Sequence, residues 1–207
     1  MNFNYETTWE HGGGLTYINN FDTSFGYAVG ALYSIKGQNY SGAVYDENLD
    51  STTFTSSLRL NYIELPLLFR FNSTLEQPDR GGYLDLAFGF SLGYLSGGSI
   101  QTQPFLSEGR ALDVDYLFRQ FEVNTVVSTH FNYLINEKWQ ISTGIRASRT
   151  IGSVEKNDIS IPDDTRLEYY YPVSLPKTAR PSEIDLETRR SLKNVVIHFG
   201  LGITRRL

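Results

Sequence analysis

The chain has 207 residues, and its 18 Lys and Arg against 23 Asp and Glu give a formal net charge of -5 at pH 7. This acidic balance argues against a nucleic-acid-binding protein, which needs a basic face. Cysteine is absent, which excludes disulfides, thiolate catalysis and cysteine-ligated metal centres. Because all-β domains often reach this length undivided, we expect residues 1–207 to form a single domain.

The hydropathy of the chain excludes one membrane architecture and leaves another open. No run of 18 apolar residues occurs and the mean hydropathy is -0.30, so a transmembrane helix is not expected. The 13 Phe, 14 Tyr and 2 Trp beside 18 Gly favour β-structure, and membrane β-barrels carry a much weaker hydropathy signal. The first residues show no basic and apolar leader, which fits either a cytosolic protein or one whose secretory signal has been removed.

Apolar residues alternate with small or polar ones along most of the chain, and this period of two predicts strands with two different faces. In the clearest stretch, Leu, Phe and Tyr from Leu84 to Tyr94 alternate with Asp, Ala, Gly and Ser. The predicted strands, in chain order, are Trp9–Ile18, Phe25–Lys36, Arg59–Phe71, Tyr83–Leu95, Phe121–Tyr133, Trp139–Thr150 and Asn194–Arg206.

The connections between these strands alternate between short and long. The short ones lie near Asn20–Ser24, Asn72–Gly81 and Ile135–Lys138, and the long ones near Ser41–Thr55, Thr102–Leu117 and Glu155–Ser191. Short turns on one side and long loops on the other are typical of outer-membrane barrels. The predicted strands also exceed the roughly 9–11 residues that cross a bilayer.

A soluble lipocalin-like barrel shows the same alternation with its apolar residues inside. Two features favour the membrane barrel. The less apolar face is rich in Gly, Ala and Ser with isolated charges, as a narrow filled lumen requires, rather than in Lys and Glu. Aromatic residues also gather at the strand ends next to the short turns, as an interfacial girdle does: Phe25, Tyr27, Phe69, Phe71, Phe131, Tyr133 and Trp139.

The number of strands is odd where bacterial barrels have an even number. If the last strand runs down to the periplasm, Trp9–Ile18 also runs down, and its upward partner is missing. That partner precedes residue 1, is a short strand within Asn2–Thr8, or comes from elsewhere. We expect an eight-stranded antiparallel up-and-down transmembrane β-barrel with a missing or short first strand and both termini toward the periplasm.

One segment, Tyr62-Ile63-Glu64-Leu65-Pro66-Leu67-Leu68, resembles the "YxE(I/L)PLL" strand of the PorT-like family of small outer-membrane barrels from Bacteroidota. Gly30–Gly37, Gly89–Leu95 and His198–Ile203 resemble three further strands of that family. The family's opening strand is not visible, and the chain ends in Leu207 rather than in an aromatic residue. The resemblance implies an integral outer-membrane protein of eight strands, usually without enzymatic activity.

Charged residues on the lumen face are the first candidate site. We expect a structural ion-pair network of Lys36, Glu64, Arg70, Asp85, Glu122 and Arg146, with Arg206, His130 and His198 on the same face. Charges inside so narrow a barrel must pair, because an unpaired buried ion is costly. Arg70 and Asp85 flank one short turn and are predicted to pair. A gated proton or solute path is the alternative use of the same residues.

Other motifs predict little chemistry. The three histidines, His11, His130 and His198, lack metal-ligand spacing, and a hydrolase built on His130 with a nearby serine is only a remote alternative. We therefore expect no catalytic residue, metal or cofactor. Pro66 lies inside a predicted strand, where it cannot donate to the ladder, so a bulge or bend is expected there.

The loop from residue 155 to 191 holds four of the seven prolines and the run Tyr169-Tyr170-Tyr171. Long loops are often functional, and clustered tyrosines suit docking on a partner, although a merely solvated loop is also possible. The sequence favours a non-enzymatic scaffold or accessory subunit of a complex, such as a secretion or assembly machine, in a Gram-negative outer membrane. Its partners would be outer-membrane lipid, lipopolysaccharide and other outer-membrane proteins. A narrow pore or solute-binding barrel is the alternative, and a lipid-modifying enzyme is remote.

Overall fold

In a computed structural model, the structure describes residues 3–6, 8, 10–22, 24–45, 51–73, 81–103, 112–114, 117–154 and 194–205. These residues form one antiparallel sheet. Its strands are β1 (Phe3–Glu6), β2 (Gly12–Asn20), β3 (Phe25–Tyr45), β4 (Ser51–Asn72), β5 (Gly81–Gln103), β6 (Leu112–Asp113), β7 (Phe121–Leu134), β8 (Trp139–Ile151) and β9 (Val195–Arg205). Within these ranges no helix is long and apolar enough to cross a bilayer.

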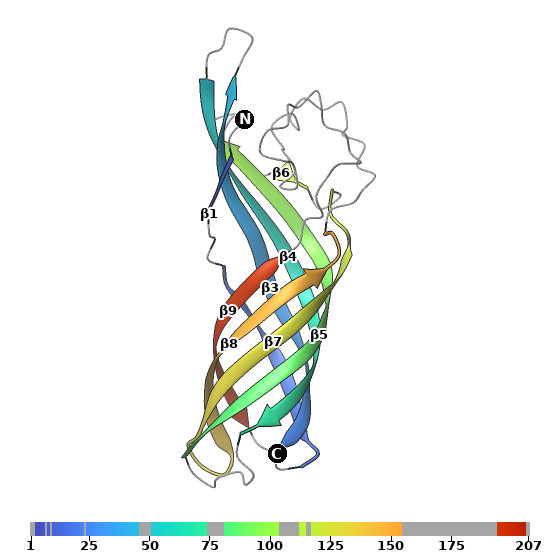
Figure 1. The fold of residues 1–207 in the computed structure, drawn as a ribbon, viewed down its shortest axis with the longest axis vertical. Coiled ribbons are helices and arrows are strands. Elements are labelled where there is room, and N and C mark those ends of the chain that lie inside the picture. The colour runs from blue at the N-terminus through green and yellow to red at the C-terminus, as the bar shows by residue number, and fades with distance from the viewer. Residues whose placement is uncertain are drawn as a thin grey trace.

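Seven long strands follow one another in the order β2, β3, β4, β5, β7, β8 and β9, and each pair of neighbours is antiparallel. The sheet twists and curls into a tilted, barrel-like wall (Figure 1). The expected all-β up-and-down architecture is therefore confirmed. The described residues provide seven of the eight expected long strands.

The connections alternate between the two ends of this wall, as predicted. The strands β2, β4 and β7 end, and β3, β5 and β8 begin, at one end of the wall, which we call the short-turn end, and β9 finishes there as well (Figure 1). The backbone N–H of Phe21 closes one turn on the carbonyl of Phe25 at 2.9 Å, and that of Ile135 closes another on Trp139 at 3.0 Å. We call the opposite end the long-loop end.

The first strand does not run upward. Glu6 in β1 pairs with Asn39 and Gly12 in β2 pairs with Ser34, both antiparallel to β3. β1 and β2 are thus successive parts of one downward path along the edge of β3. The interpretation of Asn2–Thr8 as a short upward strand is wrong for its described part, because β1 continues the line of β2. The start of β1 also lies at the long-loop end, away from the end of β9 (Figure 1).

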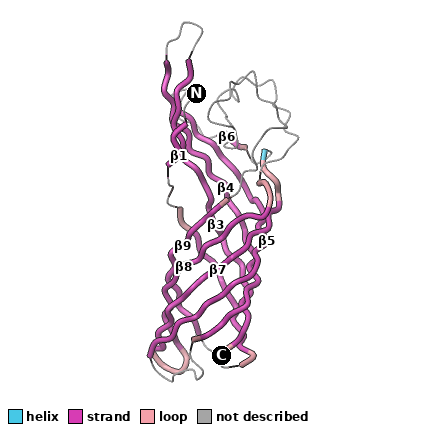
Figure 2. Tube along the Cα trace, in the orientation of Figure 1, coloured by secondary structure: helices cyan, strands magenta, loops and turns pink. Residues whose placement is uncertain are grey.

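Two of the expected long loops are partly strand. β3 continues to Tyr45 and β4 begins at Ser51, so most of the predicted loop Ser41–Thr55 belongs to the β3–β4 hairpin (Figure 2). Ser and Thr on this hairpin look like loop residues, but a strand whose outer face is in water can be polar there, as at the exposed Thr53 and Thr55. β5 similarly reaches Gln103.

The two faces of the wall differ in the expected way. Burial in β7 alternates from residue to residue, with apolar side chains pointing outward and mostly polar ones inward. Exposed apolar residues occupy the outward positions from Ile63 to Phe71 in β4 and from Leu84 to Tyr94 in β5. These stretches are nine and eleven residues long, which is the length that crosses a bilayer.

Aromatic side chains cluster on the outward face at the short-turn end. The ring of Phe25 lies 5.8 Å from that of Phe69 and 5.4 Å from that of Phe71, and Phe69 lies 5.5 Å from Phe88. These neighbouring rings on three strands form the girdle that the sequence predicted.

β3, β4 and β5 rise beyond the apolar band toward the long-loop end, where their outward residues are polar (Figure 2). We call this part the upper sheet. Its inward face is mostly apolar and is covered by the described residues 112–114 and 117–120. The Val114 N–H bonds to the Gly98 carbonyl at 2.9 Å. The buried residues of this region are Tyr40, Leu58, Leu60, Leu95, Ile100, Val114, Leu117, Phe118 and Val154.

The bulge expected at Pro66 lies elsewhere. Pro66 pairs in register with Ser91 of β5, and its missing N–H interrupts the ladder with β3 without shifting the register. The register shift is on β5, where Ser96 is the extra residue opposite Asn61 and Tyr62. A proline at this position therefore breaks hydrogen bonds and leaves the strand path unchanged.

An ion pair on the outward face of the upper sheet should contribute little. Arg59 Nε lies 2.5 Å from Glu10 Oε1, and the Arg59 side chain is about one third exposed. We expect Arg59→Ala to lower the free energy of unfolding by roughly 1 kcal/mol or less, because solvent screens exposed pairs. Urea unfolding of the folded barrel in lipid vesicles measures this, and a loss of several kcal/mol would contradict it.

Candidate functional site

The six charged residues predicted to face the lumen all lie on the inward face. Five of them are buried, namely Lys36, Glu64, Arg70, Asp85 and Glu122, and Arg146 is largely buried. Each comes from a strand whose alternate residues form the outward apolar band, so the same period that builds the outer wall directs these charges inward. They divide into a central network and a pair near the short-turn end.

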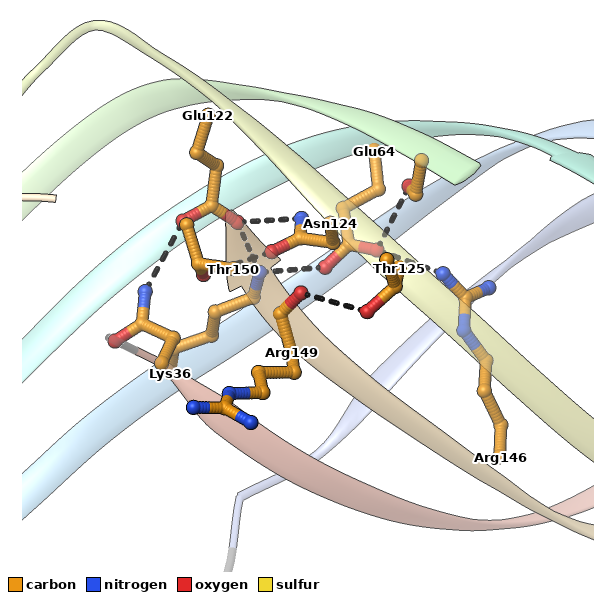
Figure 3. Close-up of polar contacts among 10 residues, drawn as sticks. Lys36, Glu64, Glu122, Asn124, Thr125, Arg146, Arg149 and Thr150 are labelled. Carbon is orange, nitrogen blue, oxygen red and sulfur yellow. Dashed lines mark hydrogen bonds and ion pairs between the residues drawn. The ribbon is translucent and has the colours of Figure 1, made fainter. Parts of the chain in front are cut away.

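The central network is a chain of alternating charge. Lys36 Nζ lies 2.9 Å from Glu64 Oε1 and also contacts Glu122, and Arg146 Nη2 donates to Glu64 Oε2 at 2.8 Å (Figure 3). Two cations meet two carboxylates, so the group is neutral as a whole. This balance is what permits four charges in a buried position, since each carboxylate has at least one cation.

Neutral side chains complete the network. Asn124 Nδ2 donates to Glu122 Oε1 at 2.8 Å, and Asn194 Nδ2 donates to Glu122 Oε2 at 3.1 Å. Ser91 Oγ donates to Glu64 Oε2 at 3.1 Å, and Thr150 Oγ1 donates to Asn124 Oδ1 at 2.8 Å. The network therefore joins β3, β4, β5, β7, β8 and the residue that precedes β9.

Lys36 is held by an aromatic ring as well as by charges. Its Nζ lies 4.6 Å from the centre of the Tyr62 ring, within cation–π range. Tyr62 is fully buried on β4, two residues before Glu64 on the same face. The ammonium thus has an aromatic face and two carboxylates around it.

Gly93 makes room for the two carboxylates. It is the register partner of Glu64 on one side and of Glu122 on the other. A Cβ at residue 93 would lie 2.8 Å from Cγ of Glu122 and 3.0 Å from its Oε1. A side chain here would displace Glu122 from Lys36, so the absence of one lets both acids reach the same ammonium.

We expect Gly93→Ala to destabilise the barrel by about 1–3 kcal/mol, the usual cost of overpacking an interior. Gly97→Ala on the same strand is the matched control, because its added Cβ would meet nothing nearer than 3.8 Å. Urea unfolding of both variants in vesicles makes the comparison. Equal stabilities for the two variants would contradict the assigned role of Gly93.

A second polar group lies nearer the short-turn end. The predicted pair of Arg70 and Asp85 forms, and His130 Nδ1 lies 3.5 Å from Asp85 Oδ1. Tyr83 Oη donates to Gln140 Oε1 at 2.9 Å in the same part of the interior. Apart from His130, which is partly exposed, these groups are buried, and they are partnered as at a structural site.

Apolar layers separate the polar ones. Along the inward face of β4, Leu58 and Leu60 are followed by Glu64, then Leu68, then Arg70. Leu68 belongs to a buried cluster with Ala28, Ala87 and Val126. The interior therefore alternates between an apolar cap, the central network, an apolar layer and the Arg70–Asp85 group. The charges of this stack balance, and its cations and carboxylates are paired.

The other expected residues include some that the structure does not describe. Tyr169, Tyr170, Tyr171, the rest of the loop 155–191 and Arg206 lie outside the described residues. His198 is the register partner of Arg146 on β9. Within the described ranges no cluster of three or more His, Asp or Glu could hold a metal ion.

Residue-by-residue reading missed Ser91, Gly93, Asn124, Thr150 and Asn194. The first four lie on the inward face of their strands, so the alternation of small and polar residues could have placed them near the charges. Asn194 precedes its strand, and its role depends on the strand order of the sheet.

One comparison with known proteins identifies the family of this chain. Residues 10–154, which are more than half of the chain, match the family described as outer membrane protein beta-barrel domain. No curated protein and no solved structure matches the chain. The match covers β2 to β8, which carry the apolar band and the central network. The chain therefore belongs to the outer membrane protein beta-barrel domain family, and it is an integral barrel protein of the outer membrane.

Proposed function

We propose that this barrel is a non-enzymatic scaffold or accessory subunit of an outer-membrane protein complex. The observation that carries the proposal is that the interior charges are paired with one another. Lys36, Glu64, Glu122 and Arg146 satisfy one another, and apolar layers lie on both sides of them. Because the interior side chains contact one another, the outer wall and the long-loop end are the surfaces that remain for binding a partner.

The upper sheet supports a docking role. It extends three strands beyond the apolar band and is supported from inside by the buried residues Val114, Leu117 and Phe118. Its outward side chains are polar and exposed, for example Thr55 and Gln103. A rigid polar sheet outside the bilayer is a surface that another outer-membrane protein or a lipopolysaccharide headgroup can contact.

The proposal has a finer part. The segment Tyr62–Leu68 supports placing the chain in the PorT-like group of Bacteroidota barrels, where some members serve secretion and gliding machinery. The short-turn end, by its short connections, fits the periplasmic side. The band of outward apolar residues is the lipid contact.

Mild-detergent extraction of the tagged protein from its native membrane tests the proposal. We expect it to elute as a defined complex well above the mass of one barrel with its detergent. Thr55→Trp on the upper sheet should weaken that complex, whereas Glu137→Trp in an exposed turn at the opposite end should leave it intact. A lone monomer from the native membrane would contradict the accessory-subunit role.

A further inference from the structure

One cation interrupts the apolar outward wall near the long-loop end. Arg149 lies two residues before the end of β8, and its side chain is exposed on the outward face. Its register partner on β9 is Val195, the first residue of that strand, so Arg149 lies where both strands meet the long-loop end. The other outward residues of β8 carry no charge, namely Trp139, Ile141, Thr143, Ile145, Ala147 and Ile151.

The Arg149 guanidinium has no anion beside it in the part of the chain that the structure describes. The backbone carbonyl of Arg149 accepts a hydrogen bond from Thr125 Oγ1 at 3.2 Å, and the side chain points away from Glu64 and Glu122 (Figure 3). The ion pairs among the described residues use other bases, namely Lys36, Arg59, Arg70, His130 and Arg146. Arg149 therefore differs from the inward cations, which all have a carboxylate.

Apolar side chains surround this cation on the outer wall. Val123 of β7 is 43% exposed, Ile151 of β8 is 54% exposed and Val195 of β9 is 68% exposed, all on the outward face. A cation on the lipid face of a barrel is costly at the bilayer centre, and the cost falls toward the interface. An arginine near a strand end can lay its methylenes along the apolar wall and place its guanidinium among the headgroups. The anion that Arg149 lacks is therefore expected at headgroup depth.

The surroundings of Arg149 favour a phosphate carried by a lipid. A guanidinium binds phosphate oxygens through two parallel N–H donors, which suits arginine to phosphate recognition. A free phosphate ion would have to leave water for an apolar wall, whereas the acyl chains of a lipid would cover Val123 and Val195. The Thr125 hydroxyl already donates to the Arg149 carbonyl, so the guanidinium is the donor that such a phosphate would meet.

We propose that Arg149 binds a phosphate of lipopolysaccharide in the outer leaflet, with the acyl chains lying along β7, β8 and β9. The inference rests on the proposed function in one respect, namely that the short-turn end is periplasmic. It also deepens that function. Lipid would occupy the β7–β9 side of the wall and leave the β3–β5 side, below the upper sheet, for a protein partner (Figure 1).

Lipid that stays on the barrel after mild-detergent extraction from the native membrane tests the proposal. Native mass spectrometry of the full-length chain, released from any partner, counts the bound lipopolysaccharide. We expect Arg149→Gln to lower this retention about tenfold, because the charge-assisted hydrogen bonds to phosphate are lost. Arg149→Lys should keep part of it, since lysine retains the charge without the planar fork. Equal retention by the wild type and Arg149→Gln would overturn the proposal.

Arg205 at the opposite end of the wall provides the matched control. It is exposed on β9 and is the register partner of Trp139 near the short-turn end. Because lipopolysaccharide occupies only the outer leaflet of the native membrane, Arg205→Gln should retain as much of it as the wild type. A loss seen with Arg205→Gln and not with Arg149→Gln would overturn the proposal together with the orientation on which it rests.

A second measurement does not depend on the folding of any variant. The wild-type full-length protein in phosphatidylcholine vesicles is titrated with lipid A and with the same lipid A after removal of its phosphates. We expect the phosphorylated form to bind about tenfold more tightly. Equal binding of the two forms would overturn the proposal. The accessory-subunit role is tested separately by the mass of the extracted assembly, so the failure of one proposal is distinguishable from the failure of the other.

Discussion

Replacing Lys36 with methionine is expected to destabilise the folded barrel by about 3–5 kcal/mol, the usual cost of removing one partner from a buried ion pair. Lys36 is buried and contacts both Glu64 and Glu122. Glu64 would keep Arg146, but Glu122 would lose its cation and keep only neutral donors such as Asn124. Most of the destabilisation therefore comes from the buried Glu122 carboxylate, which is left without a cation.

Urea unfolding in lipid vesicles measures this loss, and two further variants control it. Lys36→Met combined with Glu122→Gln should recover part of the stability, because the stranded charge is removed. Lys138→Met replaces an exposed lysine in a turn and should change stability by about 0.5 kcal/mol or less. If Lys36→Met cost no more than Lys138→Met, the central network would not stabilise the barrel.

An arginine at Leu67 should cost about 2–4 kcal/mol, the penalty for a cation at the bilayer midplane on the lipid face of a barrel. Leu67 lies in the middle of the outward apolar stretch of β4 and is exposed in the isolated chain. On the surface of a soluble protein the same change would be nearly neutral, within about 0.5 kcal/mol. The substitution therefore separates a lipid-facing wall from a water-facing one.

The control for this second prediction is an arginine on the same face of β4 but outside the apolar band. Thr55→Arg lies on the same strand and the same face, but in the upper sheet beyond the apolar band. It should change the stability in vesicles by about 0.5 kcal/mol or less, since the penalty falls toward zero outside the hydrocarbon. Equal costs at Leu67 and Thr55 would show that the outward face of β4 does not lie in lipid.

Strand faces and the inward charges could be predicted because a period of two is a local property. Once Phe69 and Phe71 are assigned outward, Arg70 must point inward, whatever the rest of the chain does. The Arg70–Asp85 pair could be predicted for a similar reason, since both residues flank one turn. Short-range geometry fixed these features.

Partners that meet across the barrel could not be predicted in the same way. Lys36 and Glu122 are 86 residues apart, and their contact depends on the order, register and tilt of several strands. The extra residue Ser96 shifts the register of β5 against β4 midway, and nothing local marks it. A single residue of shift turns every later side chain to the other face, so such pairings are known only from the whole sheet.

The extent of β3 and β4 was underestimated for a physical reason as well. Polar residues from Ser51 to Ser57 resemble a loop when they are compared with the lipid-facing stretch that follows. Beyond the bilayer, however, the outward face of a strand should be polar. The same strand thus changes its pattern where it leaves the apolar band.

Planar-bilayer recording from the full-length protein tests most directly the claim that paired charges and apolar layers fill the interior. We predict no unitary current steps above the baseline of the bare bilayer, since Lys36, Glu64, Glu122 and Arg146 form a closed network between two apolar layers. Reproducible single-channel steps from the wild-type protein would contradict a filled interior and would favour a narrow pore.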